Sequence, residues 1–287
     1  MKLSVILVIS FEKPQMVSEA LAAVFASEAD FSFEVIVVDN AAREASAGLA
    51  PFRDRLKVLR NDENLGFTRA NNRGASRAQG EYLLFLNSDT RISPDTLSLL
   101  VSFADGHPEA GAIGPLVLNN DGSVQLSWGR PLSLCSEFWQ KAVASPAARR
   151  TDPLRLQTRE VGWVSGCCLL TRREYFPGGR VFDEGIFLYF DDSELCARLG
   201  KMGHKTFFLP RARIVHYGGA SVRSMPARTA LEYRRSQLHV YRKHLPRWQL
   251  LALKLYLALK YRWKLLRSRN EDERSAAVQI IELLKKY

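Results

Sequence analysis

The 287-residue sequence has few cysteines and no long uncharged hydrophobic run. Its cysteines, Cys135, Cys167, Cys168 and Cys196, show no C-x-x-C pair and no secreted context, so we interpret them as reduced, mostly buried thiols. No stretch reaches the roughly 18 apolar residues that a membrane-spanning helix needs. Residues 1–9 are too short and too β-branched for a signal peptide, and a cytoplasmic protein is therefore expected.

Acidic residues are outnumbered: 30 Asp and Glu stand against 41 Lys and Arg, a net charge of +11. Segment 240–287 carries most of this surplus, with 12 basic and 4 acidic residues. A basic surplus favours an anionic partner, which can be a nucleotide, an anionic membrane or a nucleic acid. Hydrophobic residues make up 46% of the chain, as in ordinary globular proteins, so the composition excludes a wholly disordered chain.

Short apolar runs alternate with helical patterns in the first third of the chain. The runs predict buried strands at residues 3–9, 33–39, 56–60 and 82–86. Helices are predicted at 14–26, at 68–78 with Gly80 as its end signal, and from an N-cap at Ser93 with Pro94 first, to about 104. Since the strands are continuously hydrophobic, we expect an α/β fold with a mainly parallel sheet flanked by helices.

The later part of the chain is less regular. A strand broken by glycines is predicted at 161–171, a helix at 191–201, and a short strand at 206–209 that ends in a turn near Pro210. Beyond Tyr233 the pattern is helical almost to the end. These signals predict one α/β domain over 1–230, with halves of about 1–110 and 111–230, and a basic helical extension over 231–287.

Two groups of polar residues follow predicted strand ends, where parallel sheets bind ligands. Asp39 is placed to accept hydrogen bonds from a base or a ribose, and a solvated strand end is the alternative. Asn87, Ser88 and Asp89 follow the predicted apolar strand at 82–86. A carboxylate at such a position is a natural ligand for a hard cation that carries a diphosphate. An Asx-turn is the competing explanation.

A glycine and side-chain amides are concentrated between residues 61 and 74. Gly66 allows close approach of the backbone, and Asn64 and Asn71 can hold a polar ligand without adding charge. A tight turn followed by a helix cap would explain the same residues.

Asp191 and Asp192 stand together at the start of a predicted helix. The helix dipole and the free N–H groups stabilise both as anions, whereas their mutual repulsion has the opposite effect on one of them. Such a carboxylate can act as a base toward a sugar hydroxyl, and an N-cap pair is the alternative. His216 follows the strand near Pro210, and a single histidine is more often structural.

Taken in order, these segments resemble the family 2 glycosyltransferases of the GT-A fold, specifically the bacterial rhamnosyltransferase-like and galactofuranosyltransferase-like members. The likeness covers roughly residues 1–225. It rests on six segments: Val38–Asn40, Asn64–Gly74, Leu86–Asp89, Ser165–Arg172, Phe182–Arg198 and the H-x-x-G-x-S run His216–Ser221. A single one of these motifs is weak, but six in this order are specific.

The resemblance implies a role for each candidate residue. Asp192 would be the general base, with Asp191 beside it. Asp89 and His216 would hold Mg²⁺ or Mn²⁺ on the diphosphate. The residues implied at the nucleotide sugar are Ser10, Asp39, Asn64, Gly66, Asn71, Asn87, Ser88 and Asp89, and those at the acceptor are Trp163, Ser165 and Gly166.

The reaction implied by the resemblance is a single displacement with inversion at the anomeric carbon. Three positions depart from the family pattern. Asn87 stands where many relatives have the first Asp of Asp-x-Asp, Ala41-Ala42 replaces a region where Ser is common, and Asp191 stands where Glu is common. Only one acidic metal ligand remains, which predicts weak metal binding.

The resemblance also favours dTDP-rhamnose as the donor, with UDP-galactose or a related UDP-sugar as the alternative. A glycan or a lipid-linked glycan of cell-surface polysaccharide synthesis would be the acceptor. Segment 246–269 interleaves Trp, Tyr and Leu with Lys and Arg, a pattern typical of a helix that lies on an anionic membrane. We therefore expect peripheral binding at the inner face of the cell membrane. The alternative is that this segment packs on the catalytic domain or, in a homodimer, on a second copy.

Three other functions compete with this interpretation. A dinucleotide-dependent oxidoreductase needs G-x-G-x-x-G after the first strand, and the turn Ser10–Gln15 contains no glycine. A nucleic-acid-binding protein would explain the charge, but no DNA- or RNA-reading motif is present, so we expect no nucleic-acid partner. A catalytically silent relative that only binds nucleotide sugars is the third.

Overall fold

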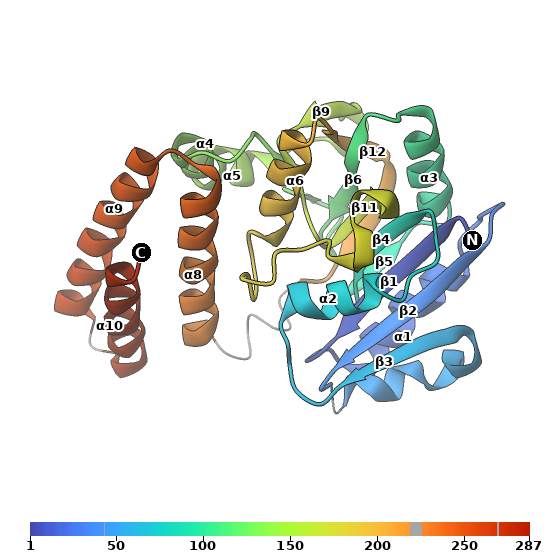
Figure 1. Cartoon of the computed structure of the whole chain (residues 1–287), viewed down its shortest axis with the longest axis horizontal. Helices are drawn as coiled ribbons and strands as arrows, with labels where there is room; N and C mark the ends of the chain where they lie inside the picture. Colours follow the sequence, from blue (N-terminus) through green and yellow to red (C-terminus); the bar gives the residue numbers. More distant parts are fainter. Residues whose placement is uncertain (43, 219–225, 269) are drawn as a thin grey trace.

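A computed structural model describes residues 1–42, 44–218, 226–268 and 270–287. A twisted central sheet carries helices on both faces, and three C-terminal helices stand together at one end of the molecule (Figure 1). The strands are β1 (Leu3–Ile9), β2 (Phe33–Asn40), β3 (Leu56–Asn61), β4 (Tyr82–Asn87), β5 (Thr90–Ile92), β6 (Ala110–Leu118), β7 (Val124–Gln125), β8 (Trp128–Gly129), β9 (Arg159–Val161), β10 (Trp163–Val164), β11 (Cys168–Arg172) and β12 (Lys205–His216). The α-helices are α1 (Pro14–Phe25), α2 (Phe67–Ala75), α3 (Thr96–Gly106), α4 (Leu134–Trp139), α5 (Ser145–Ala148), α6 (Asp191–Lys201), α8 (Pro226–His244), α9 (Arg247–Arg267) and α10 (Glu271–Lys285). Short 3₁₀ or π turns are η1 (Ala45–Arg55), η2 (Gln140–Ala144), η3 (Pro153–Arg155), η4 (Arg173–Tyr175) and η5 (Pro177–Gly179).

The main sheet has the strand order β3-β2-β1-β4-β11-β6-β12-β5. Strands β1 to β4 are parallel, β11 runs antiparallel between β4 and β6, and β12 is parallel to β6. The register pairs Ile9 with Asp39 and Val8 with Asn87. Residues that follow these strands therefore meet at one edge, and the predicted mainly parallel α/β sheet with a C-terminal helical extension is confirmed.

Both faces of the sheet are buried, which explains why its strands are continuously hydrophobic. On one face Leu7 of β1 belongs to a core that includes Leu21 of α1 and Leu100 of α3. On the other face Ile6 belongs to a second core, together with Leu195 of α6. Neighbouring residues of the same strand thus contribute to two different cores.

Helix α2 ends earlier than predicted. The sequence places its end at Ala78 with Gly80 as the end signal, but the helix runs from Phe67 to Ala75. Gly80 has a different role, because its N–H donates to Ser4 Oγ (2.8 Å), and a Cβ on Gly80 would collide with the backbone of Ser4. A long-range contact, rather than a helix cap, requires the glycine.

Helix α3 begins later than predicted. Ser93 is not its N-cap, because the helix starts at Thr96 with Asp95 as the N-cap residue. The backbone N–H of Ser93 donates instead to the carbonyl of Arg213 in β12 (3.0 Å). Ser93 and Pro94 form the turn that connects β5 to this helix.

The prediction of a turn near Pro210 is also wrong. Strand β12 continues through this residue to His216, and its pairing with β6 shifts register between Leu209 and Arg213. A proline has no N–H to donate, so an irregularity of this kind accommodates it within a sheet. The glycine-broken strand predicted at 161–171 is divided into the end of β9, β10 and most of β11.

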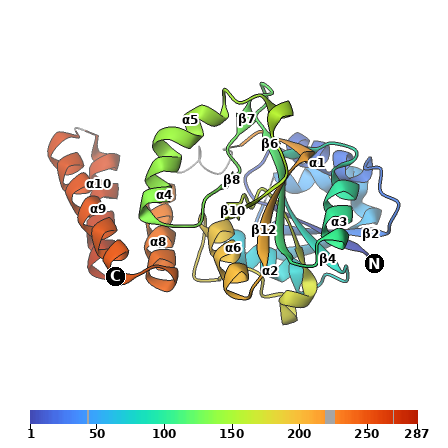
Figure 2. The same ribbon diagram turned by 90° about the horizontal axis from the view of Figure 1, so that it is seen from above.

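The C-terminal helices α8, α9 and α10 share a core of their own, in which Leu253 and Leu257 of α9 pack with Ile280 of α10. Seen from above, α4 lies beside α8 (Figure 2), and the Tyr241 hydroxyl of α8 donates to Glu137 of α4. Within the described residues no helix is long and apolar enough to cross a membrane. The predicted division at 230/231 falls inside α8 and stays a prediction.

Candidate active site

Asp39 at the end of β2 shapes the loop that follows it. Its Oδ1 accepts from the N–H of Ala42 (2.9 Å), and its Oδ2 accepts from the Ser46 hydroxyl (2.7 Å). Ala41, which directly precedes Ala42 in this loop, has φ 61°, a conformation that residues other than glycine rarely adopt. The carboxylate thus fixes a turn at the edge where β1 and β2 end.

The loop before α2 is held by a network of amides. Asn40 Oδ1 accepts from Asn61 Nδ2 (2.8 Å), and Asn40 Nδ2 donates to Asn64 Oδ1 (2.9 Å). Gly66 has φ 81°, and a Cβ there would lie 2.5 Å from the ring of Phe187. Position 66 therefore requires glycine, and the loop is positioned against the segment that leads to α6.

Two of the residues predicted to bind the nucleotide sugar form hydrogen bonds with residues close to them in the sequence. Asn71 is buried, and its Nδ2 donates to the carbonyl of Phe67 in the same helix (2.9 Å). The N–H of Ser10 donates to Glu12 Oε2 (2.6 Å). Asn71 thus contributes to α2 itself, whereas Ser10 lies at the end of β1 with the other strand-end residues.

Asp89 and His216 meet although 127 positions separate them, because β12 pairs with β5 and sets His216 opposite Thr90. His216 Nε2 lies 3.2 Å from Asp89 Oδ1, and its Nδ1 lies 3.1 Å from Gln125 Oε1. Since the amide oxygen can only accept, Nδ1 donates to Gln125, and Nε2 faces the Asp89 carboxylate. A carboxylate oxygen and a ring nitrogen thus lie next to one another.

This pair fits a divalent cation, because a carboxylate oxygen and an imidazole nitrogen are both ordinary ligands. In the part of the chain that the structure describes, no group of three or more His, Cys, Asp or Glu could hold a metal. Asn87 Nδ2 lies 3.5 Å from His216 Nε2, and the buried Ser88 donates to the carbonyl of Val8 (3.0 Å). Gly219 and Ser221 of the H-x-x-G-x-S motif lie outside the described residues.

Glu12 is a further candidate site residue, which the sequence reasoning missed. Burial raises the pKa of its carboxyl group, and the negative charge of Asp89 raises it further. It therefore lies at the same edge as Asp89. The position directly after the first parallel strand was the signal that could have identified it.

Asp191 and Asp192 begin α6, as predicted from the sequence. The two residues before them, Tyr189 and Phe190, both have positive φ, at 64° and 62°. Asp192 Oδ1 accepts from the N–H of Ser193 (2.6 Å), and its Oδ2 accepts from the N–H of Gly166 (3.2 Å). These contacts fix the direction of the Asp192 carboxylate.

The pKa values of both aspartates rise. For Asp191, burial and then the charge of Asp192 raise the pKa well above its usual range. Burial also raises the pKa of Asp192, while the N–H groups of Gly166 and Ser193 act in the opposite direction. A raised pKa brings a carboxylate closer to the range in which a general base works best.

A cavity of about 230 Å³ lies in front of these carboxylates, and its lining includes Trp163, Asp191, Asp192 and Tyr233. Trp163, which was predicted at the acceptor, thus lines the same cavity as the two aspartates. Gly166 contacts Asp192, whereas the N–H of Ser165 donates to the carbonyl of Ser127 (2.8 Å).

The loop 165–167 connects the two parts of the site. Its Gly166 holds Asp192, and the carbonyl of Cys167 accepts from the N–H of Asn87 (2.9 Å). Burial raises the pKa of the Cys167 thiol to about 12, and the charges of Asp89 and Asp192 both add to this effect. The side chain at 167 therefore lies within electrostatic reach of both carboxylates.

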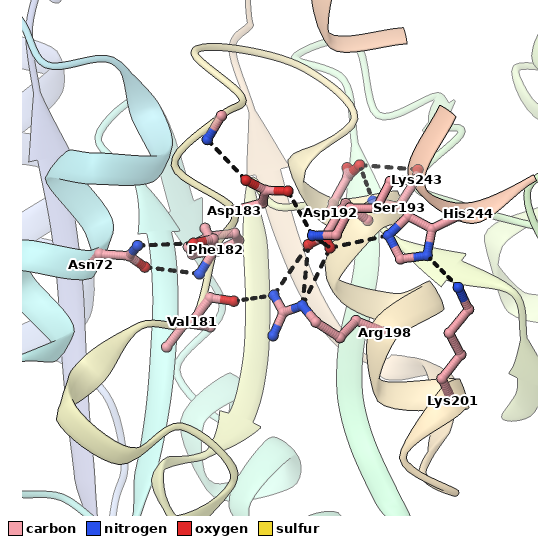
Figure 3. A network of polar contacts seen from close by, with 12 residues as sticks. Asn72, Val181, Phe182, Asp183, Asp192, Ser193, Arg198, Lys201, Lys243 and His244 are labelled. Atoms are coloured by element: carbon pink, nitrogen blue, oxygen red, sulfur yellow. Dashed lines mark hydrogen bonds and ion pairs between the residues drawn. The ribbon is translucent and has the colours of Figure 1, made fainter. Parts of the chain in front are cut away.

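A buried ion cluster attaches α6 to α8. Glu194 has no exposed surface, and it accepts from Arg198 Nη2 (3.1 Å), Lys243 Nζ (2.8 Å) and His244 Nε2 (3.1 Å). These bonds lower the pKa of Glu194 to about 2 against the cost of burial. Figure 3 shows Arg198, Lys243 and His244 in one network of polar contacts, in which the Arg198 side chain also extends toward Val181. The helix that carries Asp192 is thereby fixed to the C-terminal helices, a role that the sequence did not reveal.

Comparison with known proteins identifies the family. Residues 4–178 match the model of the glycosyl transferase family 2. The chain belongs to this family. The glycosyltransferase is 32% identical over 213 residues to the N-acetylglucosaminyl-diphospho-decaprenol L-rhamnosyltransferase of Mycobacterium tuberculosis, covering 67% of this chain and 69% of that protein.

Two further comparisons agree with the fold and the family. The rhamnosyltransferase WbbL of Escherichia coli (strain K12) is 24% identical over 200 residues, covering 69% of each chain. The structure of the mannosyltransferase PcManGT from Pyrobaculum calidifontis, in complex with GDP-Man and Mn²⁺, superposes with a TM-score of 0.59 at 18% identity. That match covers 99% of this chain and 75% of the other, which confirms the GT-A fold of the glycosyltransferase.

Proposed function

We propose that this glycosyltransferase is an inverting, metal-dependent enzyme of cell-surface polysaccharide synthesis. It transfers a sugar from a nucleoside-diphosphate sugar to a glycan or a lipid-linked glycan. The observation that carries this proposal is the Asp192 carboxylate, which Gly166 and Ser193 hold at a cavity lined by Trp163.

Asp192 takes the proton from an acceptor hydroxyl, which attacks the anomeric carbon of the donor. The bond to the diphosphate breaks as the new bond forms, so the configuration inverts. Asp191 stays protonated when its raised pKa exceeds the working pH, which leaves a single negative charge in front of the acceptor.

Rhamnose is the favoured sugar, because two relatives of this chain are named as rhamnosyltransferases. We propose dTDP-rhamnose as the donor and a UDP-linked galactose-type sugar as the alternative. Asp39 would accept from the nucleotide base at the end of β2. The other residues proposed on the donor side are Ser10, Asn64, Gly66, Asn71, Asn87, Ser88 and Asp89.

The donor is tested with a panel of sugar nucleotides, in the presence of Mg²⁺ or Mn²⁺, by thermal shift and by release of nucleoside diphosphate. An active enzyme slowly hydrolyses the donor that stabilises it. A silent relative would be stabilised without releasing nucleoside diphosphate, and that result would contradict the proposed activity.

Asp89 and His216 would hold Mg²⁺ or Mn²⁺, which offsets the charge that develops on the departing diphosphate. We expect EDTA to abolish transfer. Asp89→Ala and His216→Ala should each weaken metal-dependent nucleotide binding at least about tenfold, since each removes a ligand. Calorimetric titration of the nucleotide with and without metal measures this effect. Asp152→Ala is the control, because Asp152 is an exposed loop residue; full activity in EDTA would contradict metal dependence.

The outer face of α9 is proposed to lie on an anionic membrane. Its inner face is buried against α8 and α10, while a second apolar stripe at helical spacing is exposed by 58% to 85%: Trp248, Leu251, Leu255, Leu259, Trp263 and Leu266. Arg262 and Arg267 are exposed beside this stripe. Apolar and basic groups on one helix face suit peripheral binding at the inner face of the cell membrane.

Vesicle flotation of the full chain tests this placement. Each basic group near an anionic surface contributes about 1 kcal/mol, so we expect flotation with phosphatidylglycerol vesicles and none with phosphatidylcholine. Replacing Leu251, Leu255 and Leu259 together with Glu should abolish flotation. Val278→Glu on α10 should leave it unchanged, because Val278 is outside the stripe. Dimerisation that disappears in the triple variant would assign the stripe to a second copy instead.

A further inference from the structure

A second, larger cavity adjoins the one in front of Asp192. It has a volume of about 1060 Å³ and lies between the α4–η2 segment on one side and α8 and α9 on the other. Its walls are mostly apolar and include Phe138, Ala142, Val143 and Leu253. This volume is at the upper limit of the roughly 300–1,000 Å³ of small-molecule sites. We call this cavity the apolar groove.

The apolar groove borders the cavity of Asp192. Glu137, Lys141, Tyr189 and Tyr233 line both of them. A ligand whose sugar hydroxyl lies at Asp192 could therefore extend into the groove without leaving the protein surface.

The polar groups at this junction already have partners. Glu137 accepts from the hydroxyls of Tyr233 (3.3 Å) and Tyr241 (2.7 Å) and from Gln237 Nε2 (2.7 Å). The carboxylate is thus saturated by the protein, and burial is offset by these bonds and by Lys141, which lower its pKa. Beyond the junction the groove offers a ligand mainly apolar contact.

Basic groups stand where the groove meets the cavity of Asp192. Lys141 lines both, and Arg130 lines the cavity and stacks over Trp139 at 4.7 Å from its ring centroid. Arg234 and Lys260 also line the groove, but the rest of its walls are mostly apolar. Cations at the junction and a mostly apolar wall beyond it are complementary to a hydrocarbon chain that ends in phosphate.

Apolar rims show where the groove opens. Phe138 is 72% exposed, Val143 is 49% exposed, and Tyr256 on the α9 side is 51% exposed. All three line the groove. Apolar side chains left in water on both rims are covered favourably by a hydrocarbon.

We propose that the apolar groove binds the hydrocarbon chain of a lipid diphosphate acceptor, with its phosphates beside Lys141 and Arg130. This inference rests on the proposed lipid-linked acceptor and adds the place where its lipid lies. The chain enters between α4 and α9, and the attached sugar reaches Asp192.

Cys135 allows the groove to be tested in the unmodified protein. It lines the groove and is exposed, whereas Cys167, Cys168 and Cys196 are buried. Geranylgeranyl diphosphate should slow the reaction of Cys135 with N-ethylmaleimide at least about tenfold, and inorganic diphosphate should not, as followed by mass spectrometry. Equal rates of Cys135 modification with and without the lipid would overturn the proposal. Modification that slows with rising protein concentration in the absence of lipid would also overturn it, because a second copy of the chain would then fill the groove.

Groove-filling variants provide a test that does not depend on catalysis. Ala142→Trp should weaken binding of fluorescent geranylgeranyl diphosphate at least about tenfold, since excluding about two methylene groups is enough for this factor. Ala147→Trp is the matched control, because Ala147 lies outside the groove. Equal binding by the two variants would place the lipid elsewhere.

The proposed position of the phosphates is tested with Lys141→Gln. This variant should bind geranylgeranyl diphosphate with a smaller preference over geranylgeraniol than the wild type does. An unchanged preference would contradict the proposed orientation of the lipid. These experiments measure binding and not catalysis. If the groove binds lipid but the protein has no transferase activity, the proposed function is refuted and the proposed lipid site is not. Transfer to soluble glycans without lipid binding would refute the groove only.

Discussion

Asp192→Asn lowers kcat by about 10²- to 10⁴-fold and leaves the affinity for the nucleotide sugar unchanged. The amide has the size of the carboxylate and keeps an oxygen for the N–H groups of Gly166 and Ser193, but it cannot take the acceptor proton. Initial rates at saturating donor, together with calorimetric titration of the donor, measure the two effects.

Asp95→Asn is the control, because Asp95 is an exposed aspartate at the start of α3. Near-normal turnover of a folded Asp192→Asn protein would exclude Asp192 as the base. The wild-type pH profile gives an independent measurement. Burial raises the pKa of Asp192 above 3.8, and the base must be deprotonated, so kcat should already fall with decreasing pH above that value.

Glu194→Gln destabilises the protein by about 3 kcal/mol at pH 7, the lower end of the range for breaking a buried ion pair. The lower end applies because Arg198 and Lys243 keep part of their surface in water. Urea unfolding of the full chain measures the difference. Glu160→Gln, which removes an exposed partner of Lys205, should cost no more than about 1 kcal/mol.

The pH dependence of the Glu194 effect has a definite sign. The folded-state pKa is about 2 against an ordinary value of 4.5, so the carboxylate stabilises the fold above pH 4.5. This contribution is lost as the pH falls from 4.5 through 2, and the wild type and Glu194→Gln should converge in stability over that range. A constant difference between them would contradict the ionised cluster.

Much of the sheet could be predicted from local hydrophobicity, because strands buried on both faces leave a continuous apolar run. The helix of Asp191 was predicted with its observed bounds for a similar reason, since its amphipathic pattern is local. The errors arose where distant segments decide. Gly80 contacts Ser4, Ser93 contacts Arg213, and neither contact has a signature near the residue itself.

The site was predictable in part for the same reason. Strand ends pointed to Asp39 and Asp89, and the helix start pointed to Asp192. Glu194 lies only two positions farther along, but its partners Lys243 and His244 come from another helix. The two apolar faces of α9 were likewise interpreted as one, because periodicity shows that a helix has apolar residues and not which neighbours cover them.

The ion cluster at Glu194 has a consequence for how binding energy is used. It joins α6, which carries the proposed base Asp192, to α8, which forms a wall of the apolar groove. Free energy released by a remote part of an acceptor can then hold its reacting hydroxyl in place, because the two contact surfaces do not move independently. Acceptors with shortened hydrocarbon chains should therefore lose turnover as well as affinity.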